Sequence, residues 1–334
     1  PSVAEGKVFI VDHEGAEDVV RALDFATGQD VWQARYPDLS KPDYGFTRST
    51  PVYDDGRLYV VSYLGRVSCL DASQGAILWS VSMTDEFGGV RPRWGYAMSA
   101  LIDGERVVIV PGGVDAAVAV LNKQTGETIW VGGGSDFPGY STPVKATIQG
   151  VEQYVVFMGK ALIGVAAEDG RLLWRHPWET SSDVNAATPI VSGNHIFITS
   201  NYNRGCAVIA IEPSGPRVVW ENTGIASHVS TPVYLNGLMF GSDNRDLVCL
   251  NPNTGEIVWR APGLEKGGAV GVDGTIIALA GATGELMMFE AAPEMHELGR
   301  FTPLGGKESW TAPIIADGKL IVRNKQALVC LDIM

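Results

Sequence analysis

The segment Arg91–Tyr96, "RPRWGY", has the residue types and spacing best suited to binding chemistry. It places two arginines and two aromatic residues within six positions of a chain whose net charge is −13. A guanidinium offers a planar fork that fits carboxylates, and aromatic rings supply rigid contact area. The segment therefore favours a site for a carboxylate or an extended peptide. The open alternative is that Arg91 and Arg93 pair with Asp85 and Glu86 and only order the loop.

Five further segments of irregular sequence lie in comparable places, and most of them end in a proline that allows an alignment. Such segments lie at the ends of a repetitive β fold, where ligands and partners bind. We therefore expect their polar and aromatic side chains to surround one mouth of a central channel. The predicted site residues are Arg48, Arg91, Arg93, Trp94, Tyr96, Tyr140, Asp183, Asn185, His228 and Trp310, with Phe46, Asp136, Lys307 and Glu308 beside them.

Catalytic and metal chemistry have little support in these segments. His228 is their one histidine, and a general base would need a nucleophile or an orienting acid within reach. No Gly-x-Ser-x-Gly elbow accompanies it, so a hydrogen-bonded lining residue is the preferred interpretation. Asp183 and Asn185 are the best candidates for a calcium or quinone contact, yet calcium wants six to eight oxygens. We predict no catalytic residue and no metal ligand.

Composition excludes several classes of protein. The 334 residues carry a pI near 4.8, and an acidic surface repels nucleic acids and anionic membranes. No apolar run reaches the roughly 18 residues of a spanning helix. The four cysteines form no Cys-x-x-Cys pair, which speaks against zinc and redox motifs. Cys69, Cys249 and Cys330 share one local frame, so each is expected to act as a small buried hydrophobe.

A ten-residue phrase recurs along the chain, as in "LNPNTGEIVW" (Leu250–Trp259). It joins a strand end, a polar turn with a glycine, and a tryptophan, at a mean spacing of about 45 residues. Glycine can take the positive φ that such a turn needs. A tryptophan can cover the junction with a neighbouring unit while its N–H reaches a partner. The predicted docking residues are Trp32, Trp79, Trp130, Trp174, Trp220 and Trp259.

Each unit of about 45 residues contains four short β-branched and apolar runs between Gly, Asp and Asn turns, without a helical period. This is typical of a propeller blade. The sequence predicts an all-β, eight-bladed β-propeller of four-stranded antiparallel blades that forms a single domain, residues 1–334. The seventh unit lacks the phrase at Phe289–Phe301 but keeps strand-like runs. The eighth should lack its fourth strand, which we expect residues upstream of Pro1 to supply.

The motif L-[DN]-x-x-T-G-x-x-x-W, preceded by S-T-P-V-x-x-x-G, resembles the PQQ-like β-propeller repeat family along nearly the whole chain. That family includes quinoprotein alcohol dehydrogenases and BamB, an outer-membrane assembly lipoprotein. The resemblance implies that the repeated tryptophans dock adjacent blades. Quinoprotein enzymes carry an adjacent Cys-Cys pair and acidic groups that hold calcium beside the quinone. This chain has no such pair, and no acidic cluster in it matches theirs.

The preferred hypothesis is a non-catalytic binding or scaffolding propeller of the cell envelope. It would be a periplasmic or secreted monomer without a cofactor, and a protein, a peptide or a small ligand would bind at the mouth. The alternative is a quinoprotein oxidoreductase that uses pyrroloquinoline quinone and calcium. A hydrolase on a propeller is least favoured, because no catalytic constellation is visible.

Overall fold

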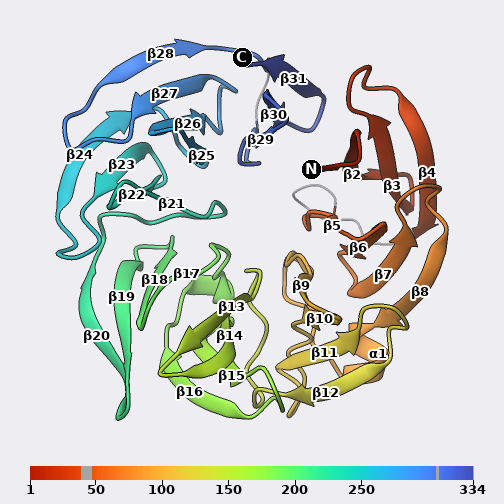
Figure 1. Cartoon of the computed structure of the whole chain (residues 1–334). Helices are drawn as coiled ribbons and strands as arrows, with labels where there is room; N and C mark the ends of the chain where they lie inside the picture. Colours follow the sequence, from red (N-terminus) through yellow and green to blue (C-terminus); the bar gives the residue numbers. More distant parts are fainter. Residues whose placement is uncertain (39–46, 306–307, 334) are drawn as a thin grey trace. The chain divides into compact units, whose positions relative to one another are not determined.

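The computed structural model describes residues 1–38, 47–305 and 308–333. Within them 31 strands form seven four-stranded sheets and one three-stranded sheet, all with antiparallel pairing between consecutive strands. The prediction of an all-β, eight-bladed β-propeller is confirmed (Figure 1). No helix among the described residues has the length and apolar character needed to cross a membrane.

The chain divides into two compact units, and the first, Pro1–Ser182, contains blades 1 to 4. Blade 1 comprises β1 (Ser2–Ala4), β2 (Lys7–Glu14), β3 (Glu17–Asp24) and β4 (Asp30–Pro37), and blade 2 comprises β5 (Val52–Asp54), β6 (Arg57–Val61), β7 (Arg66–Asp71) and β8 (Ile77–Ser82). Blade 3 comprises β9 (Leu101–Asp103), β10 (Arg106–Ile109), β11 (Val118–Asn122) and β12 (Thr128–Gly132), and blade 4 comprises β13 (Val144–Ile148), β14 (Val151–Phe157), β15 (Ala161–Ala166) and β16 (Leu172–Pro177). Helix α1 (Met83–Phe87) follows β8.

The second unit, Asp183–Met334, contains blades 5 to 8, and the 3-10 turn η1 (Ser181–Asp183) spans the point of division. Blade 5 comprises β17 (Ile190–Ser192), β18 (His195–Ser200), β19 (Gly205–Glu212) and β20 (Gly215–Asn222), and blade 6 comprises β21 (Val233–Leu235), β22 (Leu238–Ser242), β23 (Asp246–Leu250) and β24 (Ile257–Pro262). Blade 7 comprises β25 (Gly268–Val272), β26 (Thr275–Leu279), β27 (Leu286–Glu290) and β28 (Glu297–Phe301), and blade 8 comprises β29 (Ile314–Ala316), β30 (Lys319–Arg323) and β31 (Leu328–Asp332). The seventh unit is thus a complete blade despite its missing phrase.

The second and third strands of the blades carry most of the core. In β6 and β23, for example, all residues after the first are buried, whereas the fourth strands β4 and β8 are largely exposed. One apolar cluster runs from Tyr59 in blade 2 to Tyr154 in blade 4, so blades 2 to 4 share a continuous core. A second cluster joins blade 1 to blade 2. Burial of this kind is the main stabilising term of the fold.

The phrase forms the contact between successive blades within each unit. Its indole N–H donates to a backbone carbonyl of the next blade, which satisfies the one polar group of a largely apolar ring. These bonds are Trp32 Nε1 to Ala72 O (3.1 Å), Trp79 to Lys123 O (3.1 Å), Trp130 to Ala167 O (3.2 Å), Trp220 to Pro252 O (2.8 Å) and Trp259 to Ala292 O (3.0 Å). Trp174 differs, because it donates to Gln153 Oε1 of its own blade at 2.6 Å.

The glycine of the phrase meets two requirements at once. Gly126 has φ +77°, a conformation that side chains with a Cβ rarely adopt. A Cβ at this position would also lie 2.8 Å from the ring of Trp79, which belongs to the preceding blade. Gly75 and Gly170 face Trp32 and Trp130 in the same way. The turn and the docking tryptophan are therefore coupled across these three blade contacts.

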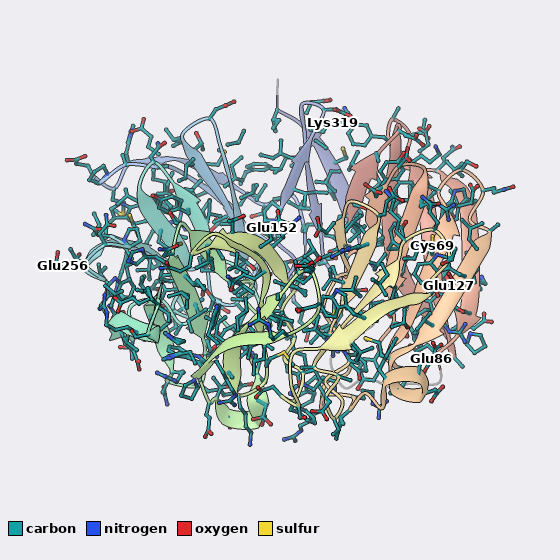
Figure 2. All side chains as sticks on the ribbon, turned by 60° about the horizontal axis from the view of Figure 1, so that its bottom comes forward. Cys69, Glu86, Glu127, Glu152, Glu256 and Lys319 are labelled. Carbon is teal, nitrogen blue, oxygen red and sulfur yellow. The ribbon has the colours of Figure 1, made fainter. Side chains whose placement is uncertain are left out.

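Two of the three cysteines that share a sequence frame are buried as that frame predicts, and the third is not. Cys69 and Cys249 are buried free thiols that pair directly with Trp79 and Trp259 across the third and fourth strands. Figure 2 shows Cys69 among the strands of its blade. Cys330 was expected to be buried, but it is exposed, because it lies on β31, which pairs only with β30 within the described residues.

Candidate functional site

Polar bonds between neighbouring connections hold the segments that enter the first strands. The Thr50 N–H donates to Ser99 Oγ of the next blade at 2.9 Å, and the Ser99 N–H donates to Thr142 Oγ1 at 3.1 Å. In the second unit Thr188 N–H donates to Thr231 Oγ1 at 2.9 Å. Thr142 and Thr231, the threonines of two S-T-P motifs, therefore each tie their own connection to the preceding one.

Two of the predicted arginines share one aromatic ring in the first unit. The guanidinium carbons of Arg48 and Arg91 each lie 5.5 Å from the centroid of the Tyr63 ring. Such cation–π contacts are worth about 0.5–2 kcal/mol each. Arg48 also donates from Nη1 to the backbone carbonyl of Trp94. Burial lowers the pKa of Arg48 below its ordinary value.

The rest of the segment is held by the same group of rings. The Arg93 guanidinium carbon lies 4.9 Å from the centroid of the Trp94 ring. The backbone N–H of Trp94 donates to Tyr140 Oη at 3.3 Å. Gly95 has φ +78°, and a Cβ there would lie 2.3 Å from the Tyr63 ring. Only glycine therefore lets the loop close over Tyr63. We call Arg48, Arg91, Arg93, Tyr63 and Trp94 the arginine cluster.

No carboxylate pairs with the arginine cluster among the described residues. The alternative that Asp85 and Glu86 neutralise these arginines does not match the structure, because both acids serve the start of helix α1. The Asp85 N–H donates to the Ser82 side chain at 3.2 Å, and Glu86 Oε1 accepts from Ser82 N–H at 3.4 Å. Figure 2 shows Glu86 on α1. Arg91 and Arg93 are exposed, so their charges are open to an anionic partner.

Tyr96 has a structural role and does not belong to the exposed surface of the arginine cluster. Its side chain is 1% exposed, and its hydroxyl donates to the carbonyl of Pro111 at 2.9 Å. Burial raises the pKa of this phenol well above its ordinary value. A Cβ on Gly65 would lie 2.6 Å from the ring, so the chain wraps closely around it. Tyr140 is also buried, but its hydroxyl reaches the cluster.

The predicted residues of the second unit have local contacts of their own. Asn185 is fully buried, and Ser200 Oγ donates to its Oδ1 at 2.7 Å. The backbone of Asp183 takes a positive φ of 56° and accepts from Asn185 N–H at 3.2 Å. His228 contacts Tyr202, and Trp310 contacts Lys266. No group of three His, Cys, Asp or Glu side chains in the described ranges could hold a metal ion.

The remaining predicted neighbours fall into two classes. Asp136 accepts two bonds of 2.8 Å from Arg175, and Glu308 forms an ion pair with Lys325. These two acids therefore have local partners. Phe46 and Lys307 lie outside the described residues.

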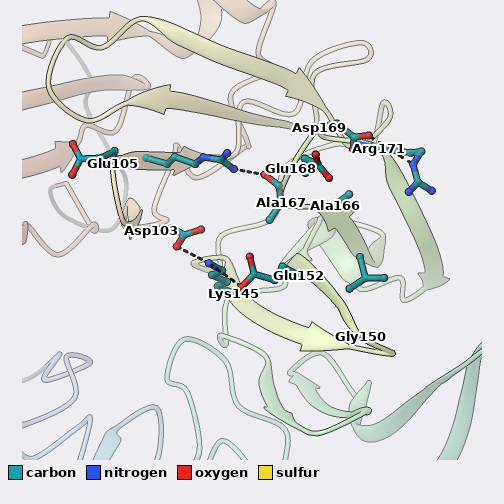
Figure 3. A pocket seen from close by; sticks show the side chains of 12 residues that line it. Asp103, Glu105, Lys145, Gly150, Glu152, Ala166, Ala167, Glu168, Asp169 and Arg171 are labelled. Carbon is teal, nitrogen blue, oxygen red and sulfur yellow. Dashed lines mark hydrogen bonds and ion pairs between the residues drawn. The ribbon is translucent and has the colours of Figure 1, made fainter.

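A polar groove that the sequence did not predict crosses blades 3 and 4, with a volume of about 610 Å³ (Figure 3). Within it Lys145 Nζ lies 2.8 Å from Asp103 Oδ1 and 3.5 Å from Glu152 Oε1. Burial acts to raise the pKa of Asp103, but hydrogen bonds from Lys145 and Tyr154 outweigh it and lower that pKa. The groove lies at the end of the blades that carries the first and third turns, so the loop of Arg91 is at the other end. Its half-buried carboxylate, Asp103, is already paired with Lys145.

A family described as outer membrane protein assembly factor BamB matches residues 16–261, which is more than half of the chain. The chain belongs to this BamB family. BamB of Yersinia pestis is 26% identical over 267 residues, which cover 76% of this chain and 61% of that protein. The chain thus spans less than two thirds of that relative. BamB of Xanthomonas campestris pv. campestris is 26% identical over 346 residues, which cover 97% of this chain and 78% of the relative.

Quinoproteins are also similar, over less of the chain. The quinoprotein ethanol dehydrogenase of Pseudomonas aeruginosa is 25% identical over 159 residues, which cover 43% of this chain and 25% of that enzyme. Among solved structures, BamB from Moraxella catarrhalis has a TM-score of 0.69 at 16% identity and covers 97% of both chains. A europium-containing methanol dehydrogenase has a TM-score of 0.62 at 13% identity and covers 96% of this chain and 81% of the enzyme. Both structural likenesses concern the fold alone.

Proposed function

We propose that this BamB-family chain is a non-catalytic scaffold in outer membrane protein assembly and binds a protein partner through the arginine cluster. Membership of the BamB family supports a role in outer membrane protein assembly. The observation that carries the site is a group of three guanidiniums that have no carboxylate partner among the described residues, in a chain of net charge −13. Unpaired arginines beside aromatic rings are typical of binding hot spots. The chain acts in the periplasm as a monomer and without a cofactor.

Exposed apolar side chains beside the cluster support a protein as the partner. Val90 precedes Arg91 and is 44% exposed, and its N–H donates to Pro111 O at 3.2 Å. Pro111 leads into the turn that carries Val114, which is 83% exposed. An apolar contact beside a charged rim is the usual composition of a protein interface. The complementary surface should combine acidic and apolar side chains.

The double variant Arg91→Ala with Arg93→Ala tests the proposed site in cells. In a strain that lacks the gene, wild type should restore the amount of folded outer membrane protein. The double variant should bind its partner about 10- to 100-fold more weakly and restore less, because two interface arginines are lost. The matched control is Arg171→Ala with Arg217→Ala, which removes the same charge from exposed arginines elsewhere.

The possible outcomes separate the function from the site. If wild type leaves outer membrane protein levels unchanged, the assembly function is wrong. If wild type restores them and the Arg91 and Arg93 variant does so equally, the function stands and the docking surface is wrong. Unchanged thermal unfolding of the purified variant would show that the loss is one of binding, because exposed arginines contribute little to stability.

The quinoprotein similarity supplies one competing function, which a direct test addresses. Purified protein is mixed with pyrroloquinoline quinone and calcium, and uptake and dye-linked alcohol oxidation are measured. The scaffold proposal expects neither. Stoichiometric uptake with alcohol oxidation would overturn it in favour of an oxidoreductase.

A further inference from the structure

The contact between blades 2 and 3 holds a lysine ammonium between two carboxylates. Lys123 Nζ of blade 3 lies 2.9 Å from Asp54 Oδ2 of blade 2 and 3.3 Å from Glu105 Oε1 of its own blade. The Lys123 side chain is only 8% exposed. Its alkyl chain is thus buried while its charge is paired. This blade contact therefore contains an alkylammonium group of its own.

Ala167 occupies the position in blade 4 that Lys123 occupies in blade 3. Both carbonyls accept the indole N–H of the docking tryptophan of the preceding blade, at 3.1 Å for Lys123 and 3.2 Å for Ala167. The Lys123 N–H donates to Glu105 O at 2.9 Å, and the Ala167 N–H donates to Glu152 O at 3.0 Å, so Glu152 corresponds to Glu105. An alanine side chain ends at Cβ, and Ala167 lines the polar groove of about 610 Å³. The space that a lysine fills in one blade contact is therefore open in the next.

The charges that line this open groove favour a cationic ligand. Five carboxylates and three cations surround it: Asp103, Glu105, Glu152, Glu168 and Asp169 with Arg106, Lys145 and Arg171. Lys145 pairs with Asp103 at 2.8 Å but lies 3.5 Å from Glu152. Glu168 forms no ion pair with any cation in the part of the chain that the structure describes, and both glutamates are exposed. Glu152 and Glu168 are therefore accessible to an ammonium group from outside.

Small and apolar residues lie between these two glutamates. The bond from Ala167 N–H to Glu152 O places Glu152 beside the residue that precedes Glu168. Figure 3 draws Glu152 and Glu168 on either side of Ala167. Val151, which is 40% exposed, and Gly150 line the same groove. An alkyl chain can cover such a floor while its charged ends reach the carboxylates, as long cationic side chains do on protein surfaces.

We propose that the polar groove between blades 3 and 4 binds a linear aliphatic diamine. One ammonium group pairs with Glu152, the other pairs with Glu168, and the alkyl chain contacts Val151 and Ala167. A ligand with two positive charges matches the excess of two carboxylates over cations in the groove. Exposed ion pairs are weak, so the expected Kd is about 1 mM. The groove and the loop of Arg91 lie at opposite ends of the blades, so this site is independent of the arginine cluster and of its partner.

Titration of the full chain with 1,4-diaminobutane tests the site. Backbone amide resonances locate the binding, and those of Val151, Glu152, Ala167 and Glu168 should shift and saturate below about 10 mM. Butylamine carries one ammonium group on the same alkyl chain and should bind about 10-fold more weakly. The uncharged 1,4-butanediol should not bind. A low ionic strength of about 0.01 M keeps the exposed charges unscreened.

Two variants and one control separate the groove from the general acidity of the chain. Ala167→Lys copies the neighbouring blade contact, so its own ammonium should reach Glu152 and reduce diamine binding about 10-fold or more. Glu168→Gln removes one of the two carboxylates and should weaken binding about 3- to 10-fold. Glu294→Gln is the matched control, because it removes the same charge from an exposed glutamate of blade 7 and should bind as wild type does.

Three results would overturn the proposal. The first is that 1,4-diaminobutane at about 10 mM moves none of the groove amides. The second is that butylamine binds as tightly as the diamine, because a single ammonium group then suffices and a lysine side chain of a protein would be the better ligand. The third is that Glu168→Gln and Glu294→Gln weaken binding equally, which would show unspecific attraction to an acidic chain.

Discussion

The ten-residue phrase and the arginine cluster place similar residue types in opposite settings. Around the phrase, Trp79 and Gly126 of successive blades fit each other so closely that no Cβ has room between them. In the arginine cluster, Arg91 and Arg93 rest on aromatic rings at the surface and have no ionic partner among the described residues. The repeated phrase thus forms contacts in which both partners belong to this chain. The irregular segments hold the arginine cluster, for which we propose a partner outside the chain.

Among these predictions, the largest loss of stability is expected from Gly126→Ala, at a contact formed by the repeated phrase. The new Cβ meets the Trp79 ring at 2.8 Å and is strained at φ +77°, so unfolding free energy should fall by about 2–5 kcal/mol. Gly104→Ala is the matched control, since Gly104 has φ +59° and no atom within 4 Å of the new Cβ. It should cost only about 1–2 kcal/mol. Denaturant unfolding measures both, and equal losses would contradict the coupling between turn and tryptophan.

A smaller, pH-dependent effect is expected from His228 in the irregular segments. Its pKa is about 4 in the folded chain and 6.5 as the ordinary value, so between these limits the unfolded chain binds more protons. Stability therefore falls as pH drops from about 6.5 to 4, by roughly 1–2 kcal/mol once screening of this half-buried ring is allowed for. Denaturant unfolding at both pH values measures the fall. His228→Asn should abolish this part of the pH dependence, and an unchanged profile would show that other groups cause it.

The smallest effect is expected from the hydrogen bonds between connections. Thr142→Val keeps the shape of the side chain but removes the acceptor for Ser99 N–H, so stability should fall by about 1 kcal/mol. Thermal unfolding of Thr142→Ser, which keeps the hydroxyl, provides the comparison. If the valine variant is no less stable than the serine variant, the threonine contributes packing and not this bond.

The fold could be predicted from the sequence because its determinants are local and repeated. A glycine four residues before a tryptophan specifies a turn and a docking ring wherever it occurs, as at Gly255 and Trp259. Blade 7 could be counted without the phrase, since the apolar runs of β26 and β27 still read as buried strands. Cys330 was misjudged because its burial depends on what covers β31, which its own sequence frame does not encode.

The site could be predicted only in part, because its contacts join loops that are distant in sequence. Arg48 and Arg91 were singled out by type, but the ring between them, Tyr63, lies in an ordinary turn of blade 2. Lys266 likewise gave no signal until the structure placed it over Trp310. The threonine of S-T-P was visible as a recurring residue, yet its bond crosses to the next blade. Only three-dimensional packing brings such residues together.

The coupling of glycine and tryptophan also bears on how such a chain can grow. Blades 2, 3 and 6 each present one ring to their successor and one glycine turn to their predecessor. A duplicated segment of about 45 residues would therefore arrive with both halves of a joint already matched to any neighbour of its kind. The two residues of the glycine–tryptophan contact are thus duplicated together with the repeat. Gene duplication can thus lengthen this architecture without any new interface having to evolve.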